Sequence, residues 1–560
     1  MNKKPGVISY VLAAILVPTA ISHAITPIAH TDVVPYQRIE HGASFNVGVV
    51  AFSMAGIDRV DFAIAGQGYS GGVKSTSAMT LNTRVASTSP GAVYPGVYEY
   101  YVPVSADDFT GNGTIAVTPT VYGGDGGVKT LRAVTLYVEG ASNESPTLAW
   151  VDGDGSDGTG TLNDETDPFP SIQTAMDAID SRNRTLDYAT IYLTEGVYDT
   201  NDRVSGTTDT TTEWVTIASA REAEIEKVII DEDGTLWDTD HIRFSGVTLR
   251  NSGPRDPAAA QTGAWFDGCR IIGPGGYGNH SPIGGSHNAY FTGCLFYNVG
   301  YVMPNTPVLG RGLRLEKIYH DVARNGSPLL VNIQVDGMYG EHPTPYHSDV
   351  YQVFDQVEDI IIYNGIFVDL QYQGLFLNSE GGTSRNAAFV NLLFEYGAKT
   401  PGGSRSWIHD QWDHLLLWHC TFGSRLAADG DWFMLWDAAY PDADPFERSN
   451  VSYIGNVFHR FGITGSAQRQ LGARYLDSGN PYGNEARYNH FCTRGMTVGE
   501  NYTTGEGVID FDAPGSATFG YPVRRSVIVD RLPSDLTGVP CDARGNPRDA
   551  NPDAGALEAR

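Results

Sequence analysis

A short motif that returns along the second half of the chain constrains the fold more than any other feature. Each copy is an apolar strand, a corner of Gly, Asn or Cys, and a second short strand. The copies lie at 242–249, 289–296, 360–367, 414–422 and 451–458. A unit this small cannot bury its apolar face alone, so each turn must pack on its neighbours. The repeat therefore predicts a solenoid of parallel strands rather than a jelly roll or a propeller.

The region around residue 150 has the pattern expected at the start of such a solenoid. A strand, Trp150-Val151-Asp152, leads into the Gly- and Asp-rich run 153–160, and apolar residues at helical spacing follow within 172–179. A strand with a turn comes next, at 189–198. We expect the short helix to cap the open end of the solenoid, where free strand edges would otherwise pair with other chains.

The tail carries a second pattern, D-x-x-G-x-x-R at 542–548 followed by D-x-G-A-x-E at 553–558. Start and tail together resemble the pectate-lyase-like superfamily of secreted β-helix proteins, over about residues 148–560. The resemblance implies an all-β fold in which a right-handed parallel β-helix with an N-terminal capping helix spans 148–510. A C-terminal tail, 511–560, would pack on that helix.

The resemblance is specific for fold and not for activity. The strand at 413–422 is similar to the pectate-lyase strand that contains Asp-His-Cys, but Trp418 replaces its Asp. The Asn-Thr-Asp, Gly-His-Gly and Arg-Ile-Lys signatures of polygalacturonases are absent from the sequence. Neither catalytic set can therefore be carried over to this chain.

Two segments precede the solenoid. Lys3 and Lys4, an apolar stretch and a small-residue site ending at Ala24 are typical of a secretory signal peptide over 1–24, with an uncleaved anchor as the alternative. No later segment is long enough to span a membrane, so we expect a secreted monomer, extracellular or periplasmic. Residues 31–140 show short β-prone runs separated by Gly, Pro and Asp. They indicate a small antiparallel β-sandwich that resembles the immunoglobulin-like modules of secreted carbohydrate-active proteins.

The net charge of −28 argues against nucleic-acid binding and suits a soluble protein in a salty or calcium-containing medium. Five cysteines are too few for a disulfide scaffold. Cys269 and Cys294 follow similar Phe-x-Gly sequences, so we expect buried thiols stacked on adjacent turns, with a disulfide as the alternative. Cys492 and Cys541 could form a bridge, which would leave Cys420 unpaired and buried.

The stretch 341–352 is the richest in side chains that could act chemically. It holds His342, Tyr346, His347, Asp349 and Gln352, where a loop enters a strand. Loops on a rigid scaffold are common positions for binding and catalytic residues. The structural alternative is that Asp349 caps a turn and His347 packs on it.

Later strands align on this one, with offsets of 24, 32 and 26 for the segments 350–356, 374–380, 406–412 and 432–438. The residues before them would form a polar column of Asp349, Gln373, Arg405 and Asp431. An aromatic column containing Trp407 would run beside it. Such columns suit a sugar-binding groove, because rings stack on sugar faces while polar groups bond to hydroxyls. If the aromatic column points inward, it belongs to the core.

Two reactions suit such a groove. β-Elimination of a uronate needs a base for the C5 proton and a cation for the carboxylate, and hydrolysis needs two carboxylates. The candidates for base or neutraliser are His347, Tyr346, Arg405 and Lys317. Asp349 with Asp321 or Asp431 could supply the carboxylate pair.

We expect a secreted polysaccharide lyase that cleaves an acidic, uronate-containing glycan. Its catalytic residues would come from His347, Asp349, Tyr346, Arg405 and Lys317. The residues expected to contact the polysaccharide are Gln352, Gln373, Trp407, His342 and Asp431. An inverting glycoside hydrolase and a non-catalytic glycan-binding surface or matrix protein are the alternatives.

A calcium site is a candidate on the glycine-rich loop after Trp150. Hard oxygen ligands are available there from Asp152, Asp154, Asp157 and Asp164. Their spacing does not match an EF-hand, and Asx turns would explain the same residues. We expect no other cofactor.

Overall fold

The structure is a computed structural model. It describes residues 24–83, 96–153, 158–180, 188–199, 214–232, 241–251, 263–275, 289–303, 308–339, 348–378, 383–397, 403–409, 412–424, 431–436, 449–459, 462–464, 485–491, 501–504, 508–509, 521–523, 526, 528–533 and 539–559. None of the helices in these ranges has the length and apolar character needed to span a membrane.

The N-terminal part is a sandwich of two mainly antiparallel sheets, in which alternate residues such as Val117 and Leu136 point into a shared core. One sheet has the order β1 (Ile28–Thr31), β3 (Ser44–Phe52), β7 (Val97–Ser105), β6 (Thr80–Asn82). The other has the order β2 (Arg38–Ile39), β10 (Val134–Glu139), β8 (Asn112–Gly123), β4 (Ile57–Ala65), β5 (Lys74–Thr76), with β9 (Val128–Thr130) beside β8. A single 3-10 turn, η2 (Ala106–Asp108), follows β7.

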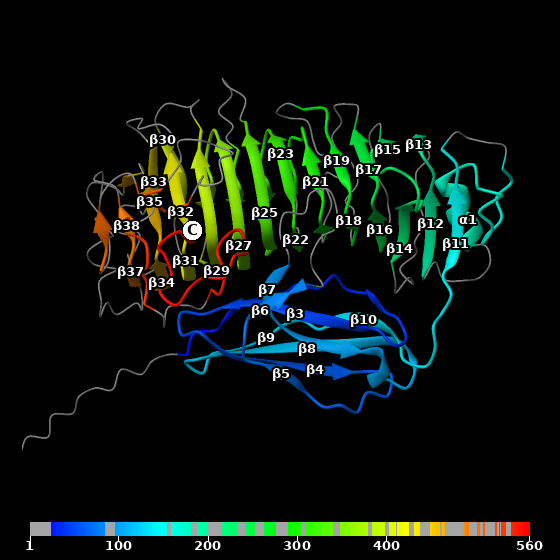
Figure 1. The fold of residues 1–560 in the computed structure, drawn as a ribbon, viewed down its shortest axis with the longest axis horizontal. Helices are drawn as coiled ribbons and strands as arrows, with labels where there is room; N and C mark the ends of the chain where they lie inside the picture. Colours follow the sequence, from blue (N-terminus) through cyan, green and yellow to red (C-terminus); the bar gives the residue numbers. More distant parts are fainter. Residues whose placement is uncertain are drawn as a thin grey trace, which may run out of the picture.

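The rest of the described chain is a solenoid whose strands pair in parallel with the strands of the next turn. The chain climbs through two sheets in every turn, and through a third sheet from residue 323 onward. Figure 1 shows the strands side by side along one long axis.

The first sheet consists of β11 (Thr147–Val151), β12 (Ala189–Leu193), β14 (Val215–Ser219), β16 (Ile242–Ser245), β18 (Trp265–Asp267), β20 (Tyr290–Thr292), β22 (Leu309–Arg311), β31 (Trp412–Trp418), β34 (Ser449–Ile454) and β37 (Glu485–Arg487). The second sheet consists of β13 (Gly196–Asp199), β15 (Val228–Glu232), β17 (Thr248–Asn251), β19 (Arg270–Ile272), β21 (Leu295–Tyr297), β23 (Arg314–Ile318), β32 (Thr421–Ser424), β35 (Val457–His459), β38 (His490–Phe491) and β39 (Thr503–Thr504). Three long strands run through both sheets, namely β25 (Leu329–Met338), β27 (Glu358–Leu370) and β29 (Ser384–Tyr396). The third sheet consists of β24 (Ala323–Arg324), β26 (Tyr351–Val353), β28 (Leu375–Asn378), β30 (Gly403–His409), β33 (Asp431–Trp436) and β36 (Gly462–Thr464).

A left-handed residue makes the corner between the first and second sheets in turn after turn. The corner positions have φ from 53° to 64° and are Gly246, Gly268, Gly293, Gly312, Asn332, Asn364, Asn391, His419, Gly455 and Tyr488. Gly and Asn tolerate this conformation better than other residues, which explains the corner motif seen in the sequence.

After five of these corners, a Cys or Asn side chain ties one turn to the turn before it. The thiols of Cys269, Cys294 and Cys420 donate to backbone carbonyls of the preceding turn at 3.3, 3.3 and 3.4 Å. The side-chain amides of Asn456 and Asn489 do the same at 2.8 and 2.9 Å. Cysteine therefore serves here as a small buried donor.

All four cysteines in the described residues are free and buried, so the predicted stacking of Cys269 and Cys294 as thiols and the unpaired Cys420 are confirmed. The suggested bridge from Cys541 is wrong, because its thiol is free and lies 3.1 Å from the Tyr363 hydroxyl. Cys492 lies outside the described residues.

The solenoid core is made by inward residues of successive strands among the described residues. Stacked rings run along it, with Phe394 between Phe367 and Phe422 at centroid distances of 4.9 Å on both sides. The helix α1 (Ile172–Asp180) lies at the N-terminal end and packs its apolar face on β11 and β12. Such cover protects the edge of the sheet.

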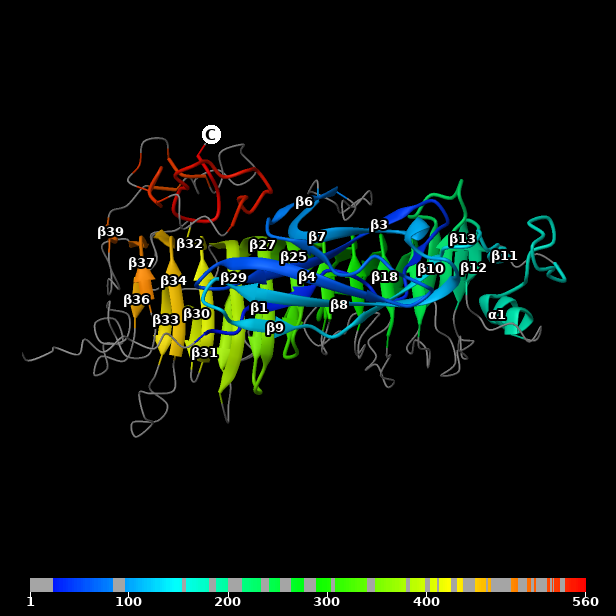
Figure 2. The same cartoon turned by 90° about the horizontal axis from the view of Figure 1, so that it is seen from below.

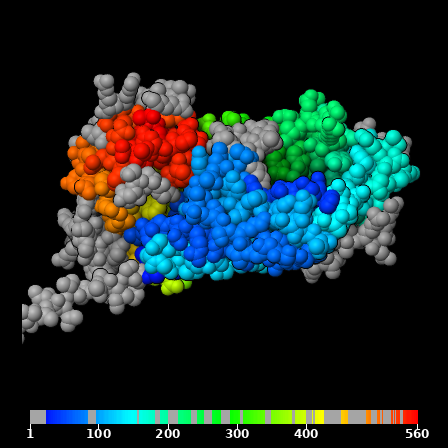
Figure 3. Space-filling view, turned by 60° about the horizontal axis from the view of Figure 1, so that its bottom comes forward, coloured from blue at the N-terminus to red at the C-terminus, as the bar shows by residue number. Residues whose placement is uncertain are grey.

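The sandwich lies along the outer face of the first sheet and shares a hydrophobic core with it (Figure 2). Phe52 of the sandwich packs edge-on against Tyr363 and Trp418 of the solenoid. A buried ion pair joins Asp32 to Arg311 at 2.7 Å across the same boundary. Figure 3 shows the blue sandwich covering the middle of this face, with the red tail beside it. The first sheet is therefore occupied by the protein itself.

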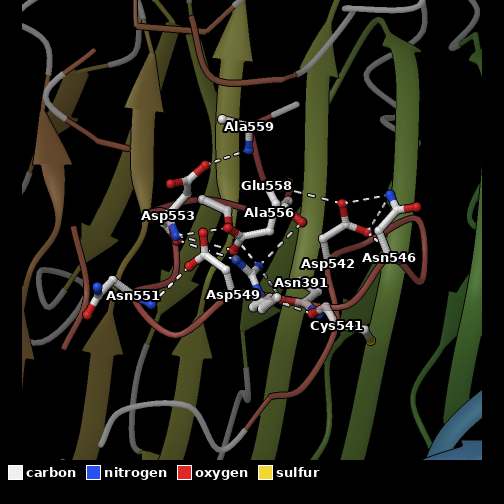
Figure 4. Close-up of polar contacts among 12 residues, drawn as sticks. Asn391, Cys541, Asp542, Asn546, Asp549, Asn551, Asp553, Ala556, Glu558 and Ala559 are labelled. Carbon is white, nitrogen blue, oxygen red and sulfur yellow. Dashed lines mark hydrogen bonds and ion pairs between the residues drawn. The ribbon is translucent and has the colours of Figure 1, made fainter. Parts of the chain in front are cut away.

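The C-terminal tail is locked onto the solenoid by the buried guanidinium of Arg548. It pairs with Glu558 and donates to the carbonyl of Cys541 at 3.0 Å and to Oδ1 of Asn391 at 2.9 Å. Asp542 closes the preceding loop by accepting from the backbone N–H of Asn546 at 2.9 Å. Figure 4 shows these carboxylates and amides gathered on the corner. The D-x-x-G-x-x-R and D-x-G-A-x-E patterns thus form one polar fastening.

The strand pairing confirms the predicted fold class, which is an all-β parallel β-helix preceded by a small antiparallel sandwich.

Candidate functional site

The outer face of the third sheet carries a ladder of side chains from neighbouring turns. Tyr351 and Leu375 point into the core, so the next residue on each strand points outward. The pairing places Arg324, Gln352 and Phe376 beside one another on this outer face. We call these three residues and Phe354 the outer ladder.

The outer ladder combines a cation with two aromatic rings. The guanidinium of Arg324 lies 4.7 Å from the ring centroid of Phe354, whose own centroid is 5.9 Å from that of Phe376. Arg324 forms no ion pair with any carboxylate of the described residues. Gln352 is 3% exposed, and its Oε1 has no hydrogen-bond partner in the part of the chain that the structure describes. The ladder therefore offers the partly exposed charge of Arg324 beside the ring of Phe354, whereas Gln352 and Phe376 are buried.

A buried acidic pair lies where β26 begins, beside the outer ladder. The backbone N–H of Asp349 donates to Oδ1 of Asp321 at 3.0 Å, and the N–H of Val322 donates to the carbonyl of Asp349 at 2.9 Å. Asp321 is 1% exposed and Asp349 is 0% exposed. The carboxylate of Asp321 and the backbone of Asp349 therefore join two turns from inside the corner.

His320, which is also buried, extends this arrangement to the preceding turn. Its ring stacks on Tyr301 of the preceding turn with centroids 3.6 Å apart. Nδ1 of His320 accepts from the N–H of Asp321 at 2.8 Å and lies 3.1 Å from Oδ2 of that residue.

The predicted site residues lie in several places. His342, Tyr346 and His347 are outside the described residues, as are Asp154 and Asp157. Asp349 is buried as above, Gln352 belongs to the outer ladder, and Gln373 is half-buried just before β28. For Trp407, Arg405 and Asp431 only the strand positions are described.

The strand register changes the predicted columns. Tyr351 pairs with Leu375, which is the expected offset of 24. Phe376 pairs with Trp407, an offset of 31 instead of 32, so Trp407 continues the register of Gln352 and not that of Tyr351. The prediction that Tyr351, Leu375 and Trp407 form one aromatic column is therefore wrong. Tyr351 and Leu375 lie in the core, and Trp407 is in register with Gln352 and Phe376 instead.

The polar column is also interrupted. Asp431 pairs with Gly403, and the register shifts between Ser404 and Ser406. Arg405 sits at that irregularity and has no paired residue on β33, so Arg405 and Asp431 do not face one another in the ladder. A bulge of one residue re-aims the side chains that follow it, which sequence spacing cannot reveal.

In the loop proposed for calcium, Asp164 forms an Asx-type turn and Asp152 bonds to the next turn of the solenoid. Asp164 accepts from the N–H and hydroxyl of Thr166 at 3.0 and 2.6 Å. Asp152 accepts from the hydroxyl of Thr194 at 3.0 Å. No group of three or more metal-ligating side chains occurs within the described ranges. Calcium at this loop stays a prediction.

Lys317 lies across a corner from the outer ladder. It stands near the end of β23 in the second sheet, whereas Arg324 follows seven residues later in the third sheet. Ile318 and Val322, between them, point into the core. Sequence spacing missed Arg324, Phe354 and Phe376, although extending the aligned turns one turn toward the N-terminus from Gln352 would have reached Arg324.

Fold and surface together define a parallel β-helix with a cationic, aromatic face on its third sheet. No protein-family model matches the chain, and no curated protein matches it. Among solved structures, the chain is distantly similar to the A-module of the Azotobacter vinelandii mannuronan C-5 epimerase AlgE6. The identity is 14%, the match covers 60% of this chain and 94% of that one, and the TM-score is 0.22. The fold therefore rests on the strand pairing and not on this likeness.

Proposed function

We propose that this protein is a secreted polysaccharide lyase that cleaves an acidic, uronate-containing glycan on the outer face of its third sheet. The observation that supports the proposal is Arg324, a cation without a carboxylate partner in the described chain, set beside aromatic rings. The protein carries a net charge of −28, so carboxylates are abundant in it. A cation that pairs with none of those described is available to bind an external anion.

The reaction begins with removal of the proton on C5 of the uronate. The electron pair left on C5 forms the C4=C5 double bond, the bond from C4 to the glycosidic oxygen breaks, and that oxygen takes up a proton. Negative charge grows on the substrate carboxylate during the first step. Arg324 would hold this carboxylate and stabilise the charge, while the half-buried ring of Phe354 positions the sugar ring.

His347 is the proposed base, and Tyr346 the proposed donor to the leaving oxygen. Both belong to the segment that leads into β26, directly before Ser348 and Asp349. Asp321 would act as a positioning residue, because its Oδ1 fixes the backbone at Asp349. The roles of His347 and Tyr346 are inferred from the sequence.

The burial of the acidic pair favours elimination over hydrolysis. A glycoside hydrolase needs two carboxylates that reach the scissile bond from the surface. Asp321 and Asp349 are 1% and 0% exposed, and one oxygen of Asp321 is already committed to the backbone. The pair proposed for hydrolysis would have to leave the core to touch a sugar.

The test is incubation with alginate, pectate and sulfated marine glycans, with absorbance of the unsaturated uronate as the readout. We expect absorbance to rise for a uronate polymer. Arg324→Gln should lower kcat/KM by about 100-fold, the usual cost of losing one group that stabilises transition-state charge. Arg385→Gln is the matched control, since Arg385 is exposed and has no ion pair among the described residues.

Other outcomes point elsewhere. New reducing ends without absorbance would indicate a hydrolase, and binding without any product would indicate a glycan-binding protein. Equal kcat/KM for Arg324→Gln and Arg385→Gln would remove Arg324 from the site. Absence of both binding and turnover with every acidic glycan would contradict the proposal.

A further inference from the structure

A second cation stands on the surface around the corner from the outer ladder. The ammonium of Lys317 is exposed, donates to the hydroxyl of Tyr297 at 2.7 Å and lies 4.9 Å from the centroid of the same ring. In Figure 1, β21 and β23 lie on the side of the solenoid away from the sandwich. Nothing in the described chain therefore covers this position from the sandwich side.

Lys317 differs from the other lysines of the described residues. Lys74 pairs with Asp108, Lys129 with Asp359, and Lys227 with Glu195 and Glu224, as the ion pairs of the described chain show. Lys317 has a phenol as its hydrogen-bond partner and no carboxylate. Its hydrogen bond to Tyr297 raises the pKa of the ammonium above its ordinary value, so Lys317 is charged at neutral pH.

Two carboxylates close to Lys317 or to the neighbouring Tyr339 already have hydrogen-bond or ion-pair partners. Glu316 is bound by Arg314 at 2.7 Å. Asp369 accepts a hydrogen bond from Tyr339, while Asp336 stands exposed on the next turn. Lys317 pairs with no carboxylate of the described residues, so an external carboxylate can bind its ammonium.

Two more tyrosines continue the surface from Lys317 toward the corner. Tyr319 and Tyr339 come from adjacent turns, with ring centroids 6.0 Å apart, and both are half-buried. The hydroxyl of Tyr319 is held by Oδ1 of Asn298 at 3.3 Å. Rings fixed in this way offer flat apolar area to a sugar at little entropic cost. We call Tyr297, Lys317, Tyr319 and Tyr339 the tyrosine–lysine cluster.

We infer that the tyrosine–lysine cluster is a second binding site for the same acidic glycan, holding one uronate unit outside the reacting site. The inference rests on the proposed function, since it takes the glycan from there. The carboxylate of the unit pairs with Lys317, and a sugar face packs on the tyrosines. A glycan long enough to turn the corner from Arg324 reaches both sites.

The corner separates this binding role from the chemistry. Lys317 and Arg324 belong to different sheets, and the chain between them turns through buried Ile318 and Val322. Lys317 on the second sheet would therefore add affinity for long glycans. The glycosidic bond would be broken at the third sheet.

The experiment compares Lys317→Met with wild-type protein on oligogalacturonates and oligomannuronates, from the dimer up to the polymer. Calorimetry gives Kd, and absorbance of the unsaturated product gives kcat. We expect Lys317→Met to weaken binding of the polymer by about tenfold, as for one lost charge-assisted hydrogen bond, and to leave the shortest bound oligomers unchanged. A purely binding role predicts a wild-type kcat at every length, whereas the catalytic role that the sequence suggested for Lys317 predicts a lower kcat. Lys227→Met is the matched control, because it removes another exposed lysine of the second-sheet side.

Two results would overturn the second site. One is an equal Kd for the polymer in Lys317→Met and wild type. The other is a fall in kcat on the shortest substrates, which would place Lys317 in the reaction itself. Failure of the proposed function is seen separately, because it would appear as absence of uronate binding in the wild-type protein at all lengths.

Discussion

At the scale of single residues, the solenoid depends on positions whose backbone only a few side chains accept. The corner between the first and second sheets is left-handed in turn after turn, and Gly and Asn hold most of these positions. This rule could be read from the sequence, because the corner residues stand between two apolar strands in each copy of the motif. The roles of cysteine and asparagine after the corner could not, since they depend on carbonyls one turn away.

Gly246 provides a test of the corner rule. Its φ is 64°, and a Cβ there would lie 3.1 Å from Oγ of Ser219, which can move. Gly246→Asn should therefore lower the free energy of unfolding by less than about 1 kcal/mol, whereas Gly246→Val should lower it by about 2 kcal/mol because a β-branched residue is strained at positive φ. Chemical denaturation of both variants measures the difference. Equal losses would show that space, and not backbone conformation, decides the corner.

At the scale of elements, the sequence predicts the repeat of strands but not the register in which they pair. The parallel strands, the capping helix and the inward apolar residues follow from periodicity that any single turn displays. Predicting the pairing of the third sheet requires the exact number of residues between its strands, and the loops that join them differ in length. The shift between Ser404 and Ser406 moved Asp431 away from Arg405, and the sequence shows no sign of it. The free cations at Arg324 and Lys317 were equally hidden, because ion pairing depends on which carboxylates lie across the turns.

The tail shows how an element without regular structure is held. Arg548 is 1% exposed as a side chain, and burial raises the pKa of Glu558 to about 7 despite the neighbouring guanidinium. Arg548→Met should destabilise the protein by roughly 3–5 kcal/mol at pH 8, where Glu558 would be a buried charge without its partner. The loss should shrink at pH 5, because a protonated Glu558 needs no cation. Thermal unfolding and limited proteolysis of the tail report both effects.

The control for this prediction lies in the same tail. The guanidinium of Arg544 lies 5.1 Å from the ring centroid of Tyr521, and Arg544→Met should cost about 1 kcal/mol or less. A pH-independent loss in Arg548→Met would mean that packing, rather than the buried charge of Glu558, controls the fastening.

At the scale of the whole molecule, the sandwich and the solenoid are joined across a boundary that is apolar at its centre and polar at one end. The shared core holds the centre. At the polar end, Lys129 of the sandwich pairs with Asp359 of the solenoid, and Asn386 joins Asp359 to His414. The sequence predicted both domains but contained no information on this docking, because the contacting residues are up to several hundred positions apart.

Two histidines make this boundary sensitive to acid. Burial lowers the pKa of His30 in the sandwich, and it lowers the pKa of His414 in the solenoid to about 4. Asp359, Lys129 and Asp32 face His30, while Asp413, Lys129 and Asp125 face His414.

The folded protein resists a proton that an unfolded histidine accepts below its ordinary pKa of about 6.5. Stability from His414 is therefore full above pH 6.5 and is lost as the pH falls to about 4, by an amount on the order of 3 kcal/mol. His414→Asn should flatten this part of the stability curve, since Asn accepts the positive φ of 62° found at His414, as Asn386 and Asn450 do. Thermal unfolding from pH 8 to pH 4, with His41→Asn as the exposed control, measures the slope. If His414→Asn and wild type lose stability in parallel over this range, other groups govern the acid response of the boundary.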